Sequence, residues 1–271
     1  MKNLFCIASL TLLVLPLAAE SLRSATVTAA IQDVQIYAGN NSAHKASIGE
    51  KLTLPSSLQT GRKSRAELTF TDNTLTRLGQ NSVFSFREGG RNVELKQGSV
   101  LMQVPKTAGG ATIRTATVTC AITGTTSMFE YNPKNWIKLI TLEGTQKLTI
   151  NGSKVSVLLP AGKMIIMHPD AKVIPAPVDI DIAKLIKTSQ LIQNGGFAPL
   201  PASALALIND TVHKQTVAKR QGLLQPTNQL VTGPGARTAA QQASSVLGGG
   251  TSPITIFPVN AQGTPFTVIV P

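Results

Sequence analysis

Acidic side chains that could act as a catalytic pair are sparse in this sequence. Hydrolases such as glycosidases use two carboxylates, of which one donates a proton and the other acts as base or nucleophile. The candidates are Glu67, Asp72 and Glu94; they form no close pair in sequence, although Glu67 and Asp72 could meet across a turn. Asp72 is already explained by that turn, because Asp side chains hydrogen-bond their own backbone there. A hydrolase is therefore the hypothesis with the least support, and we expect no enzymatic activity.

Metal-binding and nucleophilic side chains are equally isolated. His44, His168 and His213 stand far apart and lack ligand partners at metal-binding spacing, so we expect surface residues and no metal site. Cys120 lies in an apolar strand with no flanking charge to lower its thiol pKa, which predicts a buried, inert thiol. No glycine-rich loop precedes a helix, so a phosphate-binding cofactor site is not expected either.

Basic residues offer a candidate binding spot, besides exposed strand edges and the C-terminal tail, which could bind a partner protein. Arg62, Lys63 and Arg65 form the densest basic cluster, which is either a solvated loop or a contact for an anion or a partner protein. The whole chain has a formal net charge of +12, and residues 26–170 hold 16 basic against 9 acidic residues. Such a field favours acidic partners, although a generally basic, solvated surface would look the same.

The first residues have the layout of a secretory signal peptide. Lys2 is followed by an apolar stretch over 4–17 and by the small residues Ala18 and Ala19, which predicts residues 1–19 as a cleaved leader. An uncleaved anchor is the alternative, although the stretch is short for a membrane span. We expect a periplasmic or secreted bacterial protein, associated with a membrane only indirectly. Its acidic partners would then be anionic polysaccharide, lipid head groups or peptidoglycan, and not nucleic acid.

Short apolar or alternating runs separated by turn residues fill residues 26–170. Runs spaced by about 8–12 residues are typical of an all-β domain. Asn151–Gly152 predicts a two-residue hairpin turn, because both positions accept a positive φ. We predict short antiparallel strands, arranged either as a two-sheet sandwich or as a twisted β-solenoid.

The composition changes after residue 170. Residues 171–221 predict a helical extension: one helix over 181–193, capped by Asp179 and ended by Gly195–Gly196, and a second that opens at Pro201 and runs to about Gln221. These helices could pack on the β domain or on a partner. Residues 222–271 are rich in glycine and proline, which predicts a low-complexity, flexible tail.

An ordered series of motifs over residues 27–168 resembles the FecR domain. No single piece is specific, but their order is. The pieces are Leu58–Gln59–Thr60–Gly61, Thr71–Asp72–Asn73–Thr74, Val93–Glu94–Leu95–Lys96–Gln97–Gly98, Ile122–Thr123–Gly124–Thr125, Leu142–Glu143–Gly144–Thr145 and Leu159–Pro160–Ala161–Gly162.

The resemblance implies a β fold and a role in contacts. In the best-known members this domain is the periplasmic part of an inner-membrane regulator, which receives a signal from a TonB-dependent transporter and controls a sigma factor. Only three residues precede the apolar stretch here, so we expect a stand-alone exported form without direct control of a sigma factor. The leading hypothesis is a non-enzymatic protein-interaction or signalling module with an envelope protein as its partner. The alternative is a binder of anionic envelope polymer.

Overall fold

The computed structural model describes residues 24–39, 42–87, 91–193 and 195–224. The predicted signal peptide over 1–19 and residues 225–271 of the predicted tail lie outside this range. In the described part of the chain, no helix is long and apolar enough to cross a membrane.

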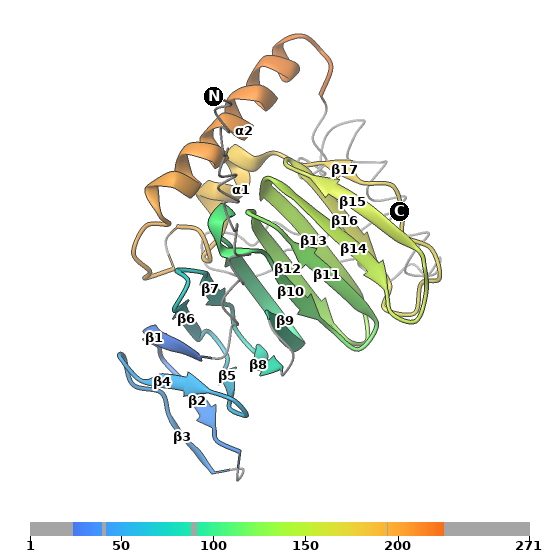
Figure 1. The fold of residues 1–271 in the computed structure, drawn as a ribbon. Coiled ribbons are helices and arrows are strands. Elements are labelled where there is room, and N and C mark those ends of the chain that lie inside the picture. Colours follow the sequence, from blue (N-terminus) through green and yellow to red (C-terminus); the bar gives the residue numbers. More distant parts are fainter. Residues whose placement is uncertain (1–23, 40–41, 88–90, 194, 225–271) are drawn as a thin grey trace, which may run out of the picture.

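Seventeen strands form one continuous mixed sheet that folds into two layers, here named sheet A and sheet B (Figure 1). Strand β9 belongs to both layers, and its parallel pairing with β10 is the exception among antiparallel pairings. In spatial order, sheet A contains β4 (Lys51–Thr53), β1 (Ser24–Ile31), β6 (Arg65–Phe70), β7 (Leu75–Leu78), β9 (Asn92–Gln103), β12 (Thr126–Asn132), β13 (Trp136–Glu143), β16 (Lys163–Met167) and β17 (Val178–Asp179). Sheet B contains β3 (Ala43–Lys45), β2 (Val34–Tyr37), β5 (Ser57–Thr60), β8 (Val83–Arg87), β9, β10 (Ala111–Arg114), β11 (Val118–Ile122), β14 (Thr145–Ile150) and β15 (Ser156–Pro160).

Gly98 is the point at which β9 passes from one layer to the other. Up to Gln97 the strand pairs with β8, and from Gly98 onward it pairs with β12. Gly98 has a φ of 97°, and a Cβ there would lie 2.4 Å from the Cα of Ser82. A side chain is therefore excluded at this bend by both backbone conformation and space.

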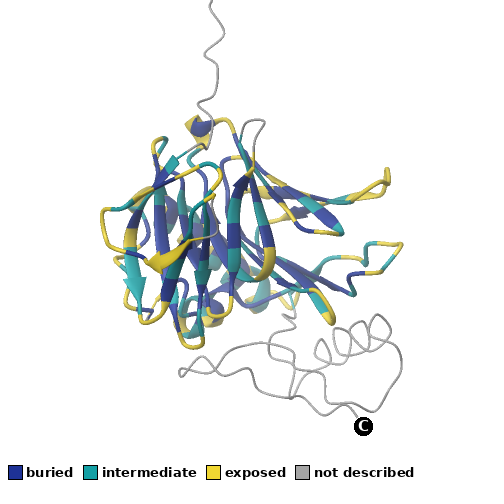
Figure 2. Cartoon of the chain, turned by 90° about the horizontal axis from the view of Figure 1, so that it is seen from below, coloured by how far each residue is buried: buried dark blue, intermediate teal, exposed yellow. Residues whose placement is uncertain are grey.

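The main hydrophobic core lies between the two layers. Buried and exposed residues alternate along the strands, because successive side chains of a strand point to opposite faces (Figure 2). Both layers contribute, with Leu68 and Phe129 from sheet A and Phe84 and Ile113 from sheet B. The all-β prediction for the domain is confirmed, and the layered core corresponds to the sandwich arrangement.

Two helices cover the outer face of sheet A. They are α1 (Ile182–Thr188) and α2 (Ala202–Arg220), and a 3-10 turn at Lys106–Ala108 completes the described elements. A second apolar cluster fills the space beneath the helices, with Ile208 of α2 and Leu185 of α1 against Ile140 and Leu142 of β13. The helices thus pack on the β layers, which was one of the two alternatives.

Three local expectations need correction. The cap of α1 is Asp181, whose carboxylate accepts a hydrogen bond from the Lys184 amide, whereas Asp179 pairs with Lys163 at 2.6 Å. The helix ends at Thr188 and does not continue to the glycine pair, because the chain turns away to cross sheet A.

The turn after β14 has four loop residues and not two, since the closing hydrogen bond joins the Val155 carbonyl to the Ile150 amide. The second helix begins and ends close to the predicted positions.

Candidate functional site

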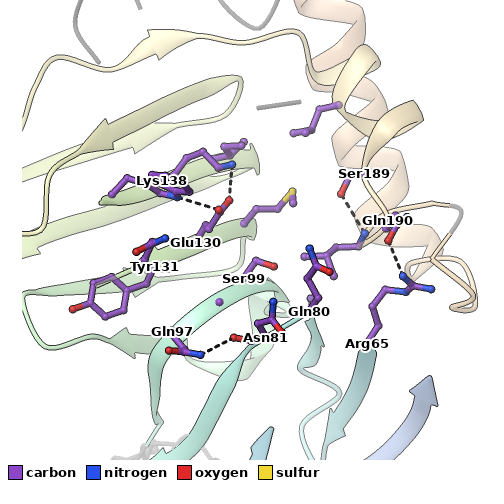
Figure 3. Close-up of a pocket in the computed structure, with 18 of the residues that line it drawn as sticks. Arg65, Gln80, Asn81, Gln97, Ser99, Glu130, Tyr131, Lys138, Ser189 and Gln190 are labelled. Carbon is purple, nitrogen blue, oxygen red and sulfur yellow. Dashed lines mark hydrogen bonds and ion pairs between the residues drawn. The ribbon is translucent and has the colours of Figure 1, made fainter. Parts of the chain in front are cut away.

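A groove of about 730 Å³ lies on the outer face of sheet A, where the helical layer leaves part of the sheet open (Figure 3). Its volume is within the range of ligand-binding sites in proteins. The floor is apolar and joins β12, β13 and β16 to the segment around α1; it consists of Met128, Ile140, Met164, Ile180, Leu185 and Leu191. The rim is polar and comes from the start of β6, the β7–β8 turn, the bend of β9 and the β12–β13 turn; it includes Lys63, Arg65, Gln80, Asn81, Gln97, Ser99 and Asn132. Such a groove can hold a chain that is apolar on one side and polar on the other.

An ion pair stands in the wall of the groove. Glu130 and Lys138 face each other across β12 and β13, with 2.6 Å between the carboxylate and Nζ. Trp136 donates a hydrogen bond from its indole Nε1 to the same carboxylate at 3.0 Å. Burial lowers the pKa of Lys138, and the neighbouring Glu130 charge partly offsets this. The pair gives the apolar groove a fixed polar point that can orient a bound segment.

The segment that follows α1, from Leu191 to Ala198, forms the far side of the groove and is here named the crossing segment. A buried arginine holds it in place. Arg77 is fully buried, and its Nε donates to the Glu67 carboxylate at 2.8 Å. Its Nη1 and Nη2 donate to the carbonyl oxygens of Leu191 and Ala198, at the two ends of the crossing segment. The guanidinium also lies 4.8 Å from the ring centroid of Phe197, a cation–π distance. Burial lowers the pKa of Arg77, and Glu67 counteracts that shift.

The predicted basic cluster divides at this site. Arg65 lines the groove but uses its Nε on the Gly195 carbonyl at 2.8 Å and its Nη1 on the Gln190 side chain at 2.7 Å. Lys63 is exposed on the rim. Arg62 is exposed as well and is not among the described residues that line the groove. The contact role of these residues stays a prediction, with Lys63 as the side chain best placed for it.

The sequence between β5 and the start of β14 matches a known family. Residues 56–145 match the family model described as FecR protein. Residues 56–145 are a FecR domain. Proteins of the FecR family are typically non-enzymatic. The groove lies on the outer face of this FecR domain and is closed by residues that follow it.

Solved structures show a more distant likeness. Two crystal structures, at 1.65 and 2.50 Å resolution, are of a putative anti-sigma factor from Parabacteroides distasonis. Each has a TM-score of 0.42 and covers 59% of this chain and 75% of the other, with 15% and 14% identity respectively. Among curated proteins, none matches the sequence.

The three candidate hydrolase carboxylates each have an arginine partner in or beside the FecR domain. Glu67 binds Arg77 on sheet A, as described above, and Asp72 binds Arg91 at the β6–β7 turn. Glu94 lies on the sheet B half of β9, 3.4 Å from Arg87. They are thus placed on different surfaces, and the structure does not bring them together as a pair.

The isolated histidines and the cysteine have ordinary surroundings. The Nε2 of His44 lies 2.6 Å from Glu50, and the Nδ1 of His168 lies 3.7 Å from Asp170. Within the described residues, no group of three or more His, Cys, Asp or Glu side chains is placed to hold a metal ion. Cys120 is fully buried, and burial raises the pKa of its thiol. The prediction of a buried cysteine is confirmed.

Sequence analysis missed Arg77, Glu130 and Lys138. Arg77 and Glu67 are ten residues apart on paired strands, but the carbonyl partners of Arg77 come more than a hundred residues later. Glu130 and Lys138 lie on the two strands of the β12–β13 hairpin, and equal distances from its turn place them opposite each other. That hairpin geometry was the available signal for the ion pair.

Proposed function

We propose that this chain is a non-enzymatic protein-interaction and signalling module of the bacterial cell envelope. It would be exported by residues 1–19 and act in the periplasm or at the cell surface. The observation that carries the proposal is the amphipathic groove on the outer face of the FecR domain. Its apolar floor and polar rim suit a segment of another protein, which would bury side chains on the floor and hydrogen-bond to the rim.

The bound segment would lie between the β12–β13 turn and the crossing segment that follows α1. Gln97 and Asn132 mark the mouth, and the Glu130–Lys138 pair lies further in. Because Arg65 and Arg77 fix the crossing segment by hydrogen bonds to Gly195, Leu191 and Ala198, the groove is preformed. A preformed groove loses little entropy on binding, which favours a specific partner.

Photo-crosslinking in intact cells tests this function. A photoreactive amino acid at Asn132 should yield a defined protein adduct, and one at Thr149 on sheet B should not. A Gln97→Trp substitution, which fills the mouth from an exposed position, should abolish the Asn132 adduct; Thr149→Trp is the matched control. If Asn132 yields no protein adduct, or if both tryptophan variants affect it equally, the groove is not the contact site.

Export needs its own measurement. Fractionation should place the chain outside the cytoplasm, and its N-terminus should begin after residue 19. A full-length chain in the cytoplasm would contradict the envelope location.

A further inference from the structure

The outer face of sheet B, from β8 to β15, is strongly basic. Side chains that alternate with core residues such as Val93, Ile113 and Leu148 must point outward there. Five exposed cations belong to these strands and to the loop between β14 and β15: Arg87, Lys96, Arg114, Lys147 and Lys154. Among the described side chains of these strands, Glu94 is the one outward carboxylate.

Charge on this face is not balanced locally. The Glu94 carboxylate lies 3.4 Å from the Nε of Arg87, so it forms an ion pair with one of the five cations. Among the described residues, Lys96, Arg114, Lys147 and Lys154 form no ion pair. Some charges elsewhere are paired closely, as at Glu130–Lys138 and Lys163–Asp179, whereas single exposed cations such as Lys51 have no ion pair among the described residues either. Four cations on a flat open face attract a partner with several negative charges.

Hydroxyl groups lie in register beside two of the cations. One row crosses five strands through cross-strand neighbours: Glu94, Arg114, Thr119, Thr149 and Ser156. A second row runs through Thr112, Ala121, Lys147 and Leu158. With neighbouring strands about 4.8 Å apart, the first row extends over roughly 19 Å. The first row thus places one cation, Arg114, beside three hydroxyl side chains, and the second row adds Lys147 next to them. Their combined length suits an extended polymer and exceeds a single small anion.

The other side chains of the face limit the kind of polyanion. Phe84 and Phe86 are the aromatic residues of these strands, and both point into the core. Single-stranded nucleic acid is held by aromatic stacking, and a membrane surface by inserted apolar or aromatic side chains. The described strands of this face offer no outward aromatic group, and their exposed large apolar side chains are limited to Leu158, 63% exposed, and Val155 of the β14–β15 loop, 37% exposed. Hydroxyls and cations without stacking groups fit a polymer that carries both hydroxyls and carboxylates.

We propose that the outer face of sheet B, from β8 to β15, binds an acidic polysaccharide. Arg114, Lys147, Lys154 and Lys96 pair with its carboxylates, and Thr119, Thr149 and Ser156 hydrogen-bond to its hydroxyls. This surface lies on the opposite side of the main core from the groove. Binding of a polysaccharide here and binding of a protein in the groove are therefore independent and can fail separately.

Binding of the full chain to polygalacturonate tests the proposal, with neutral dextran and phosphatidylglycerol vesicles as comparison probes. A triple variant, Arg114→Gln, Lys147→Gln and Lys154→Gln, removes three cations from the face. The matched control, Lys51→Gln, Lys172→Gln and Lys184→Gln, removes the same charge at other exposed positions. Thermal unfolding checks that both variants remain folded.

The wild-type chain should bind polygalacturonate but not dextran, and binding should weaken as salt is raised toward about 0.15 M. The sheet B variant should bind about tenfold more weakly, whereas the control should change less than about twofold. An equal loss in both variants would mean attraction to net charge alone and would overturn the proposal. Binding to vesicles that depends on the same face and exceeds binding to polygalacturonate would also overturn it, in favour of a lipid surface.

Discussion

Sheet A and sheet B each turn one face to the shared core, and their outer faces have opposite characters. The outer face of sheet A carries Leu101, Ile140 and Met164 under a helical layer, with charged groups buried as pairs. The outer face of sheet B carries Lys, Arg, Thr and Ser that face away from the core. Charge therefore has two roles in this chain: on sheet A it fixes a structural segment, and on sheet B it is exposed to solvent.

The same residue type therefore differs in energetic role between the two faces. A buried arginine must satisfy its donors within the protein, because an unpaired buried charge is very costly. An exposed arginine is solvated, and its removal costs little in the folded state. Paired substitutions on the two faces test this comparison directly.

The largest effect is expected for Arg77→Met. The substitution leaves the buried Glu67 carboxylate without its cationic partner, with only the Thr28 hydroxyl as a donor among the described residues, and frees the carbonyls of Leu191 and Ala198. The free energy of unfolding should fall by about 3–5 kcal/mol, as for other buried pairs broken on one side. Urea denaturation of the full chain measures it. The matched change on sheet B, Arg114→Met, should stay within about 0.5 kcal/mol.

A double variant separates the two parts of this effect. Adding Glu67→Leu to Arg77→Met removes the orphaned charge, so part of the stability should return. Full recovery would mean that the carbonyls of the crossing segment need no donor. Equal losses for Arg77→Met and Arg114→Met would contradict the comparison of the two faces.

The second prediction concerns apolar contacts on the two faces. Ile208 of α2 is fully buried against sheet A, whereas Leu158 on sheet B is 63% exposed. Ile208→Ala should lower the free energy of unfolding by roughly 2–4 kcal/mol, because it leaves a cavity. Leu158→Ala should change it by less than about 0.5 kcal/mol. A small effect of Ile208→Ala would show that the helical layer contributes little to the stability of the β layers.

The contrast between the sheets is visible in the sequence once the period of two is followed strand by strand. The β16 sequence, Lys163–Met167, contains a continuous apolar stretch, as expected for a strand covered on both sides. The β13 sequence, Trp136–Glu143, is buried along nearly its whole length, although Lys138 and Thr141 interrupt its apolar residues. The β11 sequence, Val118–Ile122, and the β14 sequence, Thr145–Ile150, alternate, as expected for strands with one open face. The sequence thus contained the all-β fold and the helices, whereas the layer that the helices cover is known from the structure.

The sequence could not supply the contacts that make the groove. Arg77 lies between polar Thr76 and apolar Leu78 and has the local appearance of a surface residue on an alternating strand. Its burial depends on a segment that returns more than a hundred residues later. The cap of α1 was misplaced for a similar reason, since Asp179 and Asp181 are equally good capping residues and the pairing of Asp179 with Lys163 decides between them.

The smallest predicted effect concerns a partly buried charge at the helical layer. Asp181 caps α1 and binds Lys219 near the end of α2, which ties the two helices together. Burial alone would raise the pKa of Asp181, but the hydrogen bonds from Lys219 and from the Lys184 amide outweigh it and lower the pKa below its ordinary value of 3.8. Asp181→Asn keeps a capping oxygen and removes the charge, so it should lower the free energy of unfolding by about 1 kcal/mol at neutral pH.

This difference should depend on pH in one direction only. Because the pKa of Asp181 is lower in the folded state, its charge stabilises the fold above about pH 4, and that stabilisation is lost as the pH falls through the folded-state pKa. The unfolding free energies of wild type and Asp181→Asn should therefore differ at neutral pH and converge in acid. On sheet B, Glu94→Gln removes the carboxylate of an exposed pair and should cost less than about 0.5 kcal/mol at neutral pH. A gap between wild type and Asp181→Asn that persists unchanged in acid would show that the charge of Asp181 is not what stabilises the helical layer.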